Sequence, residues 1–377
     1  MSIKNEPLIR ISKRDEMAKW KSWGVRLLAI LLALVLNGII IYFISGRELN
    51  PLVVYKTMFE GVFGKDPAKY LTSRRTWAWI RDMMMLLCIA VGLAPAFKMR
   101  FWNIGAEGQI LAGGIGAAAC MIYLGSSNLP NWLLLVIMAA ASVLCGAVWG
   151  LIPSIFKAYW NTNETLFTLM MNYIAIQFTS FFIPFWEHPA GSNTVGTINS
   201  ATKMGWFPSM FGQMYGLNVL IVMTITVATF IYLKYSKQGY EIGVVGESEN
   251  TARYAGINVR TVVIRSMTIS GAICGLAGFL SVAGADHSIS VNTSGGKGFI
   301  AIIVAWLAKF NTLVMILIAA MIVFLDKGAI AIASQFRLSN DVSNILTGVI
   351  LFFILSSEFF INYHLRFSFG HREEHKK

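Results

Sequence analysis

Residues 27–44 read LLAILLALVLNGIIIYFI, an almost continuous apolar run whose length decides the fold class. A helix needs about 20 mostly apolar residues to cross the hydrocarbon core of a bilayer. Similar runs recur along the rest of the chain, so we expect an all-α polytopic membrane protein with about ten transmembrane helices. The predicted spans are 25–45, 77–97, 104–125, 132–153, 165–186, 216–235, 262–284, 298–311, 312–332 and 342–361.

The composition supports the same class. The chain has 377 residues, of which 56% are hydrophobic and only 13% are charged, and its mean hydropathy is +0.61. Soluble domains carry about 25% charged residues. The net charge of +12 would suit a nucleic-acid-binding protein, but most of the basic residues lie between apolar runs and do not form a patch. The four cysteines lie inside apolar runs, without the spacing of a metal or disulfide framework.

The Lys and Arg distribution predicts the sidedness. With ten spans and a cytoplasmic N-terminus, 20 of the 31 basic residues fall on the cytoplasmic side, which predicts that both termini are cytoplasmic. Residues 1–24 then form a cytoplasmic tail, and residues 1–377 form a single membrane domain. A basic stretch between Arg47 and Arg81 goes against this locally. Within it, PLVVYKTMFEGVFG (51–64) predicts an outer interfacial helix, either a connector or a docking surface.

Four polar stretches are candidates for function. In the first, FWNIGAEGQILAGGIGAA (101–118), Asn103, Glu107 and Gln109 stand among glycines at the start of a span. Ionisable residues at membrane depth usually face a cavity or a partner. One interpretation is a re-entrant or broken helix that lines a solute path. The other is a cytoplasmic boundary, where Glu107 is solvated and the glycines allow close helix packing.

The second stretch is NTNETLFTLMMNYIAIQF (161–178). Asn163 and Glu164 are typical of a helix start, where a side chain caps the free backbone N–H groups. Thr168 and Asn172 are four residues apart and therefore share one helix face. An Asn inside a span generally bonds across helices, so Asn172 is a candidate either for helix packing or for solute contact.

The third stretch, YSKQGYEIGVVGESENTARYAGINVRTVVIRS (235–266), is the longest predicted cytoplasmic loop between spans. Ser248 can cap a short helix, and Gly256 suits its end. Such a helix would be a docking site for a soluble partner. The alternative is a solvated loop without a partner. The fourth stretch, GADHSISVNTSGGKGF (284–299), contains Asp286 and either lines an external mouth or forms an ordinary loop.

These stretches resemble, in order, motifs of the branched permease family of bacterial ABC importers, which serves ribose, other simple sugars, nucleosides and branched-chain amino acids. FWNIGAEGQ resembles FFNIGxEGQ of the nucleoside-type members, NETLFTLMMNYIA resembles NEVxxTLMLNYIA, and GYEIGVVGESENTARYAGI resembles GYxLRAVGxNxxAARYAGI. The resemblance covers residues from about 77 to 361. Two departures are Gly243 in place of a usual basic residue, and GGKGFIAIIVAWLAK (295–309) in place of GYGFxGIAVALLG.

The resemblance implies the partners and the coupling residues. It implies a second permease in a heterodimer, an ABC ATPase, and an extracytoplasmic solute-binding lipoprotein. Loop 236–262 resembles the coupling helix that docks on the ATPase. The coupling residues it implies are Gly246, Glu247, Asn250, Arg253, Tyr254, Gly256 and Ile257.

The predicted function is that of a permease subunit of an ATP-driven nucleoside importer, in the bacterial cell membrane. The chain has no phosphate-binding loop or hydrolase motif, so we expect no catalysis and no cofactor in it, and ATP hydrolysis by a separate chain. The alternatives are a simple-sugar permease and an ion-coupled secondary transporter. The predicted solute path contains Asn103, Glu107, Gln109, Asn172 and Asp286.

Overall fold

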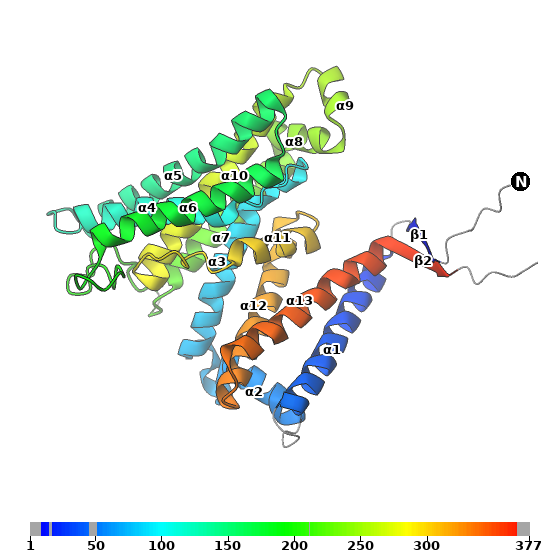
Figure 1. Ribbon diagram of the computed structural model, residues 1–377, viewed down its shortest axis with the longest axis horizontal. Coiled ribbons are helices and arrows are strands. Elements are labelled where there is room, and N and C mark those ends of the chain that lie inside the picture. The colour runs from blue at the N-terminus through cyan, green and yellow to red at the C-terminus, as the bar shows by residue number, and fades with distance from the viewer. Residues whose placement is uncertain (1–8, 15–16, 45–50, 211, 368–377) are drawn as a thin grey trace, which may run out of the picture. The chain divides into compact units, whose positions relative to one another are not determined.

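The computed structural model describes residues 9–14, 17–44, 51–210 and 212–367, and this part of the chain is mainly helical (Figure 1). Nine of the described helices are long and apolar enough to cross a membrane. One shorter apolar helix, Lys297–Leu307, stands where the eighth span is predicted. The all-α prediction is confirmed, with nine long helices and a short one in place of ten full spans.

Figure 1 labels the α-helices and the two strands in their order along the chain. In order they are β1 (Ile9–Lys13), α1 (Lys19–Ile44), α2 (Pro51–Phe63), the 3₁₀ helix η1 (Pro67–Thr72), α3 (Arg74–Lys98), α4 (Ala106–Leu124), α5 (Asn131–Trp160), α6 (Glu164–Trp186), α7 (Gly216–Tyr235), α8 (Lys237–Glu247), α9 (Glu249–Tyr254), α10 (Val259–Ser281), the π-helical turn η2 (Val282–Asp286), α11 (Lys297–Leu307), α12 (Thr312–Gln335), α13 (Asn340–Asn362) and β2 (Tyr363–Phe367).

Two boundaries differ most from the predicted ones. Helix α5 continues through Pro153 to Trp160. A proline inside a span is tolerated because neighbouring helices can satisfy the backbone group that it leaves without a partner. Helix α1 begins at Lys19, so the predicted tail of residues 1–24 is too long. Within that tail, residues 1–8, 15 and 16 lie outside the described residues, while residues 9–13 form a strand that the sequence did not predict.

The chain divides into two compact units, Met1–Ala68 with Phe324–Lys377, and Lys69–Val323. In the smaller unit, α1 packs along α13, and the strands beside them, β1 and β2, pair antiparallel. The helix predicted at 51–64 is present as α2, and it buries Val54, Met58 and Val62. Residues from the first and last parts of the chain thus form one body.

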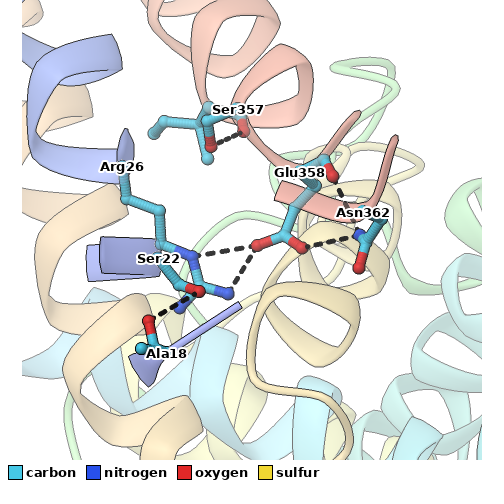
Figure 2. A network of polar contacts seen from close by, with 7 residues as sticks. Ala18, Ser22, Arg26, Ser357, Glu358 and Asn362 are labelled. Carbon is cyan, nitrogen blue, oxygen red and sulfur yellow. Dashed lines mark hydrogen bonds and ion pairs between the residues drawn. The ribbon is translucent and has the colours of Figure 1, made fainter. Parts of the chain in front are cut away.

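An ion pair joins α1 to α13 inside the smaller unit, as Figure 2 shows. Arg26 donates from Nε and Nη2 to Oε1 of Glu358 at 2.9 and 2.5 Å. The Nδ2 atom of Asn362 donates a hydrogen bond of 2.8 Å to the backbone carbonyl of Glu358 and a longer one of 3.4 Å to Oε2 of its carboxylate. Only 12% of the Arg26 side chain and 19% of the Glu358 side chain are exposed. The pair is therefore largely desolvated.

Removing one member of this pair should be more harmful than removing both. Arg26→Met leaves the Glu358 carboxylate without its cation, and loss of one partner of a buried pair typically costs roughly 3 kcal/mol. The double variant Arg26→Met, Glu358→Met removes both charges and should unfold at a higher temperature than Arg26→Met alone. Thermal unfolding in detergent measures both variants. Equal melting temperatures for the single variant and the wild type would contradict this account.

In the larger unit, α10 is the central helix and packs against α3, α4 and α5. Its contact with α5 is a backbone-to-backbone one. A Cβ atom at Gly275 would lie 2.8 Å from the Cα atom of Gly146, and one at Gly150 would lie 2.7 Å from the carbonyl oxygen of Met267. Small residues four apart, Gly271 and Gly275 on one helix and Gly146 and Gly150 on the other, allow this approach. These glycines thus let the backbones of α5 and α10 come into contact.

Candidate functional site

The turn between α3 and α4 is held together from inside by Asn103, which is completely buried. Its Oδ1 atom accepts the backbone N–H of Gly105 at 3.0 Å. Its Nδ2 atom donates to Oγ of Ser270 on α10 at 3.1 Å and to Oε1 of Gln109 at 3.3 Å. Gln109 is also buried. The two predicted residues therefore join the start of α4 to the middle of α10.

Helix α6 holds the same turn from the other side. The Oδ1 atom of Asn172 accepts the N–H of Gly108 at 2.8 Å, and its Nδ2 atom donates to the carbonyl of Ile104 at 2.9 Å. One turn earlier, Oγ1 of Thr168 accepts the N–H of Ile104 at 3.2 Å. Thr168 and Asn172 share a helix face, as predicted, and both are buried against the α3–α4 turn.

Glu107 joins the beginning of α4 to the beginning of α11. Its Oε1 atom accepts the backbone N–H of Gly298 at 2.5 Å. Helix α11 starts after Gly296, which has a positive φ of 73° and no side chain to cap the helix. The Glu107 carboxylate supplies the missing acceptor and favourable charge at this N-terminus. Since Glu107 is only 6% exposed, the interpretation in which it is solvated does not describe this structure.

The polar segment between η2 and α11 (residues 287–296) runs beside α4. It begins at His287, whose ring stacks on Trp206 with centroids 3.8 Å apart. Ile289 is buried, and its Cδ1 atom lies 3.4 Å from the position of a Cβ atom at Gly114. The segment ends next to Gly298, at the first turn of α4. Stretch 284–299 thus packs along α4 through Ile289 and Gly298, and its place at an external mouth stays a prediction.

Asp286 lies apart from the other predicted pathway residues. It is exposed, and its Oδ2 atom accepts a hydrogen bond of 2.6 Å from Ser281. Along α10 and η2, 16 residues separate it from Ser270, a distance of about 24 Å.

Glu107 gives a prediction with a conservative control. Glu107→Leu removes the acceptor for the Gly298 N–H and leaves this buried donor unpaired, which typically costs about 1–3 kcal/mol. Glu107→Gln keeps a side-chain carbonyl oxygen within reach and should retain most of the stability. Thermal unfolding of the two purified variants in one detergent gives the comparison. A leucine variant as stable as the glutamine variant would show that the bond does not hold α11.

The loop between α7 and α10 contains two short helices, α8 and α9 (Figure 1). As predicted, Ser248 caps α9, accepting the N–H of Thr251 at 3.2 Å. Gly256, with a φ of 75°, ends the helix, and the N–H of Ile257 donates to the carbonyl of Ala252 at 3.0 Å. This bond closes the C-terminal turn.

The predicted coupling residues divide into an exposed group and an anchoring one. Exposed are Glu247, Asn250, Arg253, Tyr254 and Gly256, and Ile257 is half-buried. Tyr254 is highly exposed, with 94% of its surface open to solvent. Gly246 is buried instead, and a Cβ atom there would lie 3.2 Å from Cα of Met99 and would overlap the carbonyl oxygen of Lys98.

An ion pair of 2.8 Å between Glu241 and Arg265 ties α8 to α10 as well. Beside α9 lies an open cavity of about 580 Å³, which charged and polar side chains of α5, α9 and α10 line. In it, the guanidinium of Arg260 stacks over the ring of Tyr159 at 5.2 Å from its centroid. The loop thus presents an exposed polar surface that is fixed to both α3 and α10.

Among the described residues, nine apolar helices long enough to cross a membrane, together with an anchored polar loop, are typical of an integral membrane protein. The model of one protein family, described as branched-chain amino acid transport system / permease component, matches residues 76–355. The chain belongs to this family. Because the match covers most of the chain and includes both the α3–α4 turn and the α8–α9 loop, the features above lie inside the family's shared region.

Three curated relatives are similar over nearly their whole length. The guanosine ABC transporter permease protein NupP of Bacillus subtilis is 29% identical, over 92% of this chain and 95% of its own. The nucleoside ABC transporter permease protein NupB of Lactococcus lactis is 27% identical, over 88% and 90%. The glucose ABC transporter permease protein TsgB13 of Haloferax volcanii is 25% identical, over 97% and 95%.

The structure therefore brings four of the five predicted pathway residues together, Asn103, Glu107, Gln109 and Asn172. Their polar atoms bond mainly to protein groups, and their contact with solute stays a prediction. Sequence reasoning missed two of the groups they bind, Ser270 and the N–H of Gly298. Ser270 follows Asn103 by 167 positions, and no spacing rule links residues so far apart.

Proposed function

We propose that this chain is the permease subunit of an ATP-driven importer for nucleosides. The observation that carries the proposal is the nearly full-length similarity to two permeases named for guanosine and for nucleosides. The NIGAEGQ sequence at 103–109, which resembles the nucleoside-type motif, supports the same solute class. A simple sugar is the second candidate, because the glucose permease is similar over an equal share of the chain.

The proposed assembly follows from the exposed α8–α9 loop. We assign loop 236–262 as the docking site of a separate ABC ATPase, which hydrolyses ATP so that this chain needs neither catalysis nor a cofactor. A second permease and an extracytoplasmic binding lipoprotein complete the importer. Residues 1–377 then act as one membrane domain, with the residues before α1 on the cytoplasmic side.

The terminal strands support the proposed sidedness. Since β1 precedes α1, β2 follows α13 and the two strands pair, the beginning of α1 and the end of α13 lie together. A chain with both ends on one side crosses the membrane an even number of times. The nine long helices among the described residues give an odd number of crossings, and we assign the tenth crossing to segment 287–296 with α11. The Lys and Arg distribution then favours cytoplasmic ends.

A continuous set of contacts leads from the proposed docking loop to the helix bundle. Gly246 on α8 rests on the backbone of Lys98 and Met99, immediately before the α3–α4 turn. Within that turn, Asn103 binds Ser270 of α10. Movement of the loop on ATPase closure would therefore act on α3, α4 and α10 together, as alternating access requires.

Co-purification from the native host tests the proposal. The tagged chain is solubilised in mild detergent, and bound proteins are identified by mass spectrometry. We expect an ATPase with a phosphate-binding loop, a second permease and a lipoprotein, and the lipoprotein should bind nucleosides. Recovery of the chain alone, with uptake that follows an ion gradient, would instead identify a secondary transporter.

A further inference from the structure

One face of α6 carries polar side chains on its exposed side in mid-span. Tyr173, Gln177 and Ser180 are spaced four and three residues apart and are all exposed. Around them stand the exposed rings of Phe178 and Phe181, with 51% and 61% of their surfaces open. We call these five residues the α6 outer face. Gln177 lies about 20 Å along the helix from Glu164, well inside the thickness of a bilayer.

The α6 outer face differs from the exposed faces of neighbouring helices. On α5 the exposed side chains in mid-span are apolar, as at Val136, Leu144 and Val148. On α7, Thr224 is exposed but donates to the carbonyl of Leu220 at 2.8 Å in its own helix. These faces suit contact with lipid, which offers no hydrogen-bond partners.

Gln177 does not suit contact with lipid. Among the described residues, neither its amide nor the Tyr173 hydroxyl has a hydrogen-bond partner. The bonds that pack α6 into the bundle leave from its opposite side, where Asn172 and Thr168 meet the α3–α4 turn. An amide without a partner is costly in hydrocarbon, and polar residues inside spans mark cavities or partners.

The α6 outer face is also hollowed. A cavity of about 590 Å³ is lined by Tyr173, Ile174, Gln177, Phe178 and Phe181. A second one of about 440 Å³ continues along the same helix from Thr162 to Ile174. Ile174 lines both, so the two form one groove that leads from the start of α6 to its middle. Both are open, shallow hollows whose exposed lining is almost entirely apolar.

We propose that the α6 outer face lines the solute pathway, and that Gln177 and Tyr173 bind the heteroaromatic base of the solute. A carboxamide offers both donors and an acceptor, which match the mixed hydrogen-bonding edge of a nucleobase. Phenyl rings offer stacking surfaces for its flat faces. The inference rests on the proposed function, in which the partner permease supplies the opposite wall of the groove.

A polar-to-apolar substitution tests the contact. Leucine is compatible with a membrane environment, so the Gln177→Leu variant should fold. A change in its uptake rate therefore measures the loss of a contact with the solute. In proteoliposomes with the full importer, we expect roughly a tenfold loss in kcat/KM for guanosine, the loss of about one hydrogen bond to a polar solute. The matched control is Thr224→Val on the exposed face of α7, which should keep wild-type uptake. Wild-type uptake by Gln177→Leu would overturn the proposal.

Thiol labelling tests the pathway independently. In the assembled importer, Gln177→Cys should react with a water-soluble, membrane-impermeant maleimide above the background of the native cysteines, and guanosine should slow the reaction. Leu144→Cys on the lipid-exposed face of α5 should not react. A Gln177→Cys that reacts only with a lipid-soluble reagent, or that reacts without any protection by guanosine, would overturn the proposal.

The failure of this inference is distinguishable from failure of the proposed function. If the wild-type importer transports guanosine with ATP but Gln177 variants behave normally, only the assignment of the α6 outer face is wrong. If the wild-type importer transports glucose and not guanosine, the nucleoside assignment itself is wrong.

Discussion

Gly275→Leu is expected to prevent the larger unit from folding. A Cβ atom at Gly275 would lie 2.8 Å from Cα of Gly146 and would overlap the carbonyl oxygen of Ser142. Both obstacles are backbone atoms of α5, so no side chain can rotate away. Overpacking of ordinary cores costs about 1–3 kcal/mol, and separation of two backbones should exceed that range.

The yield of monodisperse protein by size-exclusion chromatography, and its melting temperature, measure this effect. Gly348→Leu on α13 is the matched control, because a Cβ atom at Gly348 meets nothing within 4 Å. The control should behave as wild type, while Gly275→Ala should be destabilised to a smaller extent than Gly275→Leu. A Gly275→Leu chain with wild-type yield and melting temperature would show that α5 and α10 do not pack through their glycines.

The second large effect is expected at the end of α9. Gly256 has a φ of 75°, and a Cβ atom there would meet nothing within 4 Å. A β-branched residue is strained at this φ, by about 1–3 kcal/mol. Gly256→Val should therefore disturb the exposed turn without disturbing the core. We expect uptake to fall roughly tenfold or more, with normal amounts of inserted protein.

Gly191 provides a control with the same backbone strain at another place. Its φ is 79°, and a Cβ atom there also meets nothing within 4 Å. Gly191→Val should be strained equally but should keep its coupling between ATP hydrolysis and uptake. Nucleoside-stimulated ATPase activity and uptake are measured on the same proteoliposomes. Normal coupling in Gly256→Val, or equal losses of uptake in both variants, would show that this turn does not couple ATP hydrolysis to uptake.

Local rules predicted the spans and caps well. Hydrophobic run length placed every long helix, and the predicted span 216–235 coincides with α7. Capping logic correctly identified Asn163, whose side chain accepts the N–H of Leu166 at 3.1 Å, and Ser248. These features depend on residues within one or two turns, so the sequence contains all the information that they need.

Long-range contacts could not be predicted in the same way. The bond from Gly298 to Glu107 and the ion pair of Arg26 with Glu358 join residues 191 and 332 positions apart. Segment 287–296 has the composition of a surface loop, and only its partners on α4 show that it packs along this helix. The pairing of β1 with β2 depends on the packing of α1 along α13, which no local pattern indicates.

The central claim is that ATP hydrolysis in a partner chain moves nucleoside through this permease. Its most direct test is uptake of radiolabelled guanosine into proteoliposomes that contain this chain, the second permease, the ATPase and the lipoprotein. We predict uptake that requires ATP and the lipoprotein, and that is unchanged when proton and sodium gradients are collapsed. Uptake without the ATPase that disappears when those gradients are collapsed would contradict the claim.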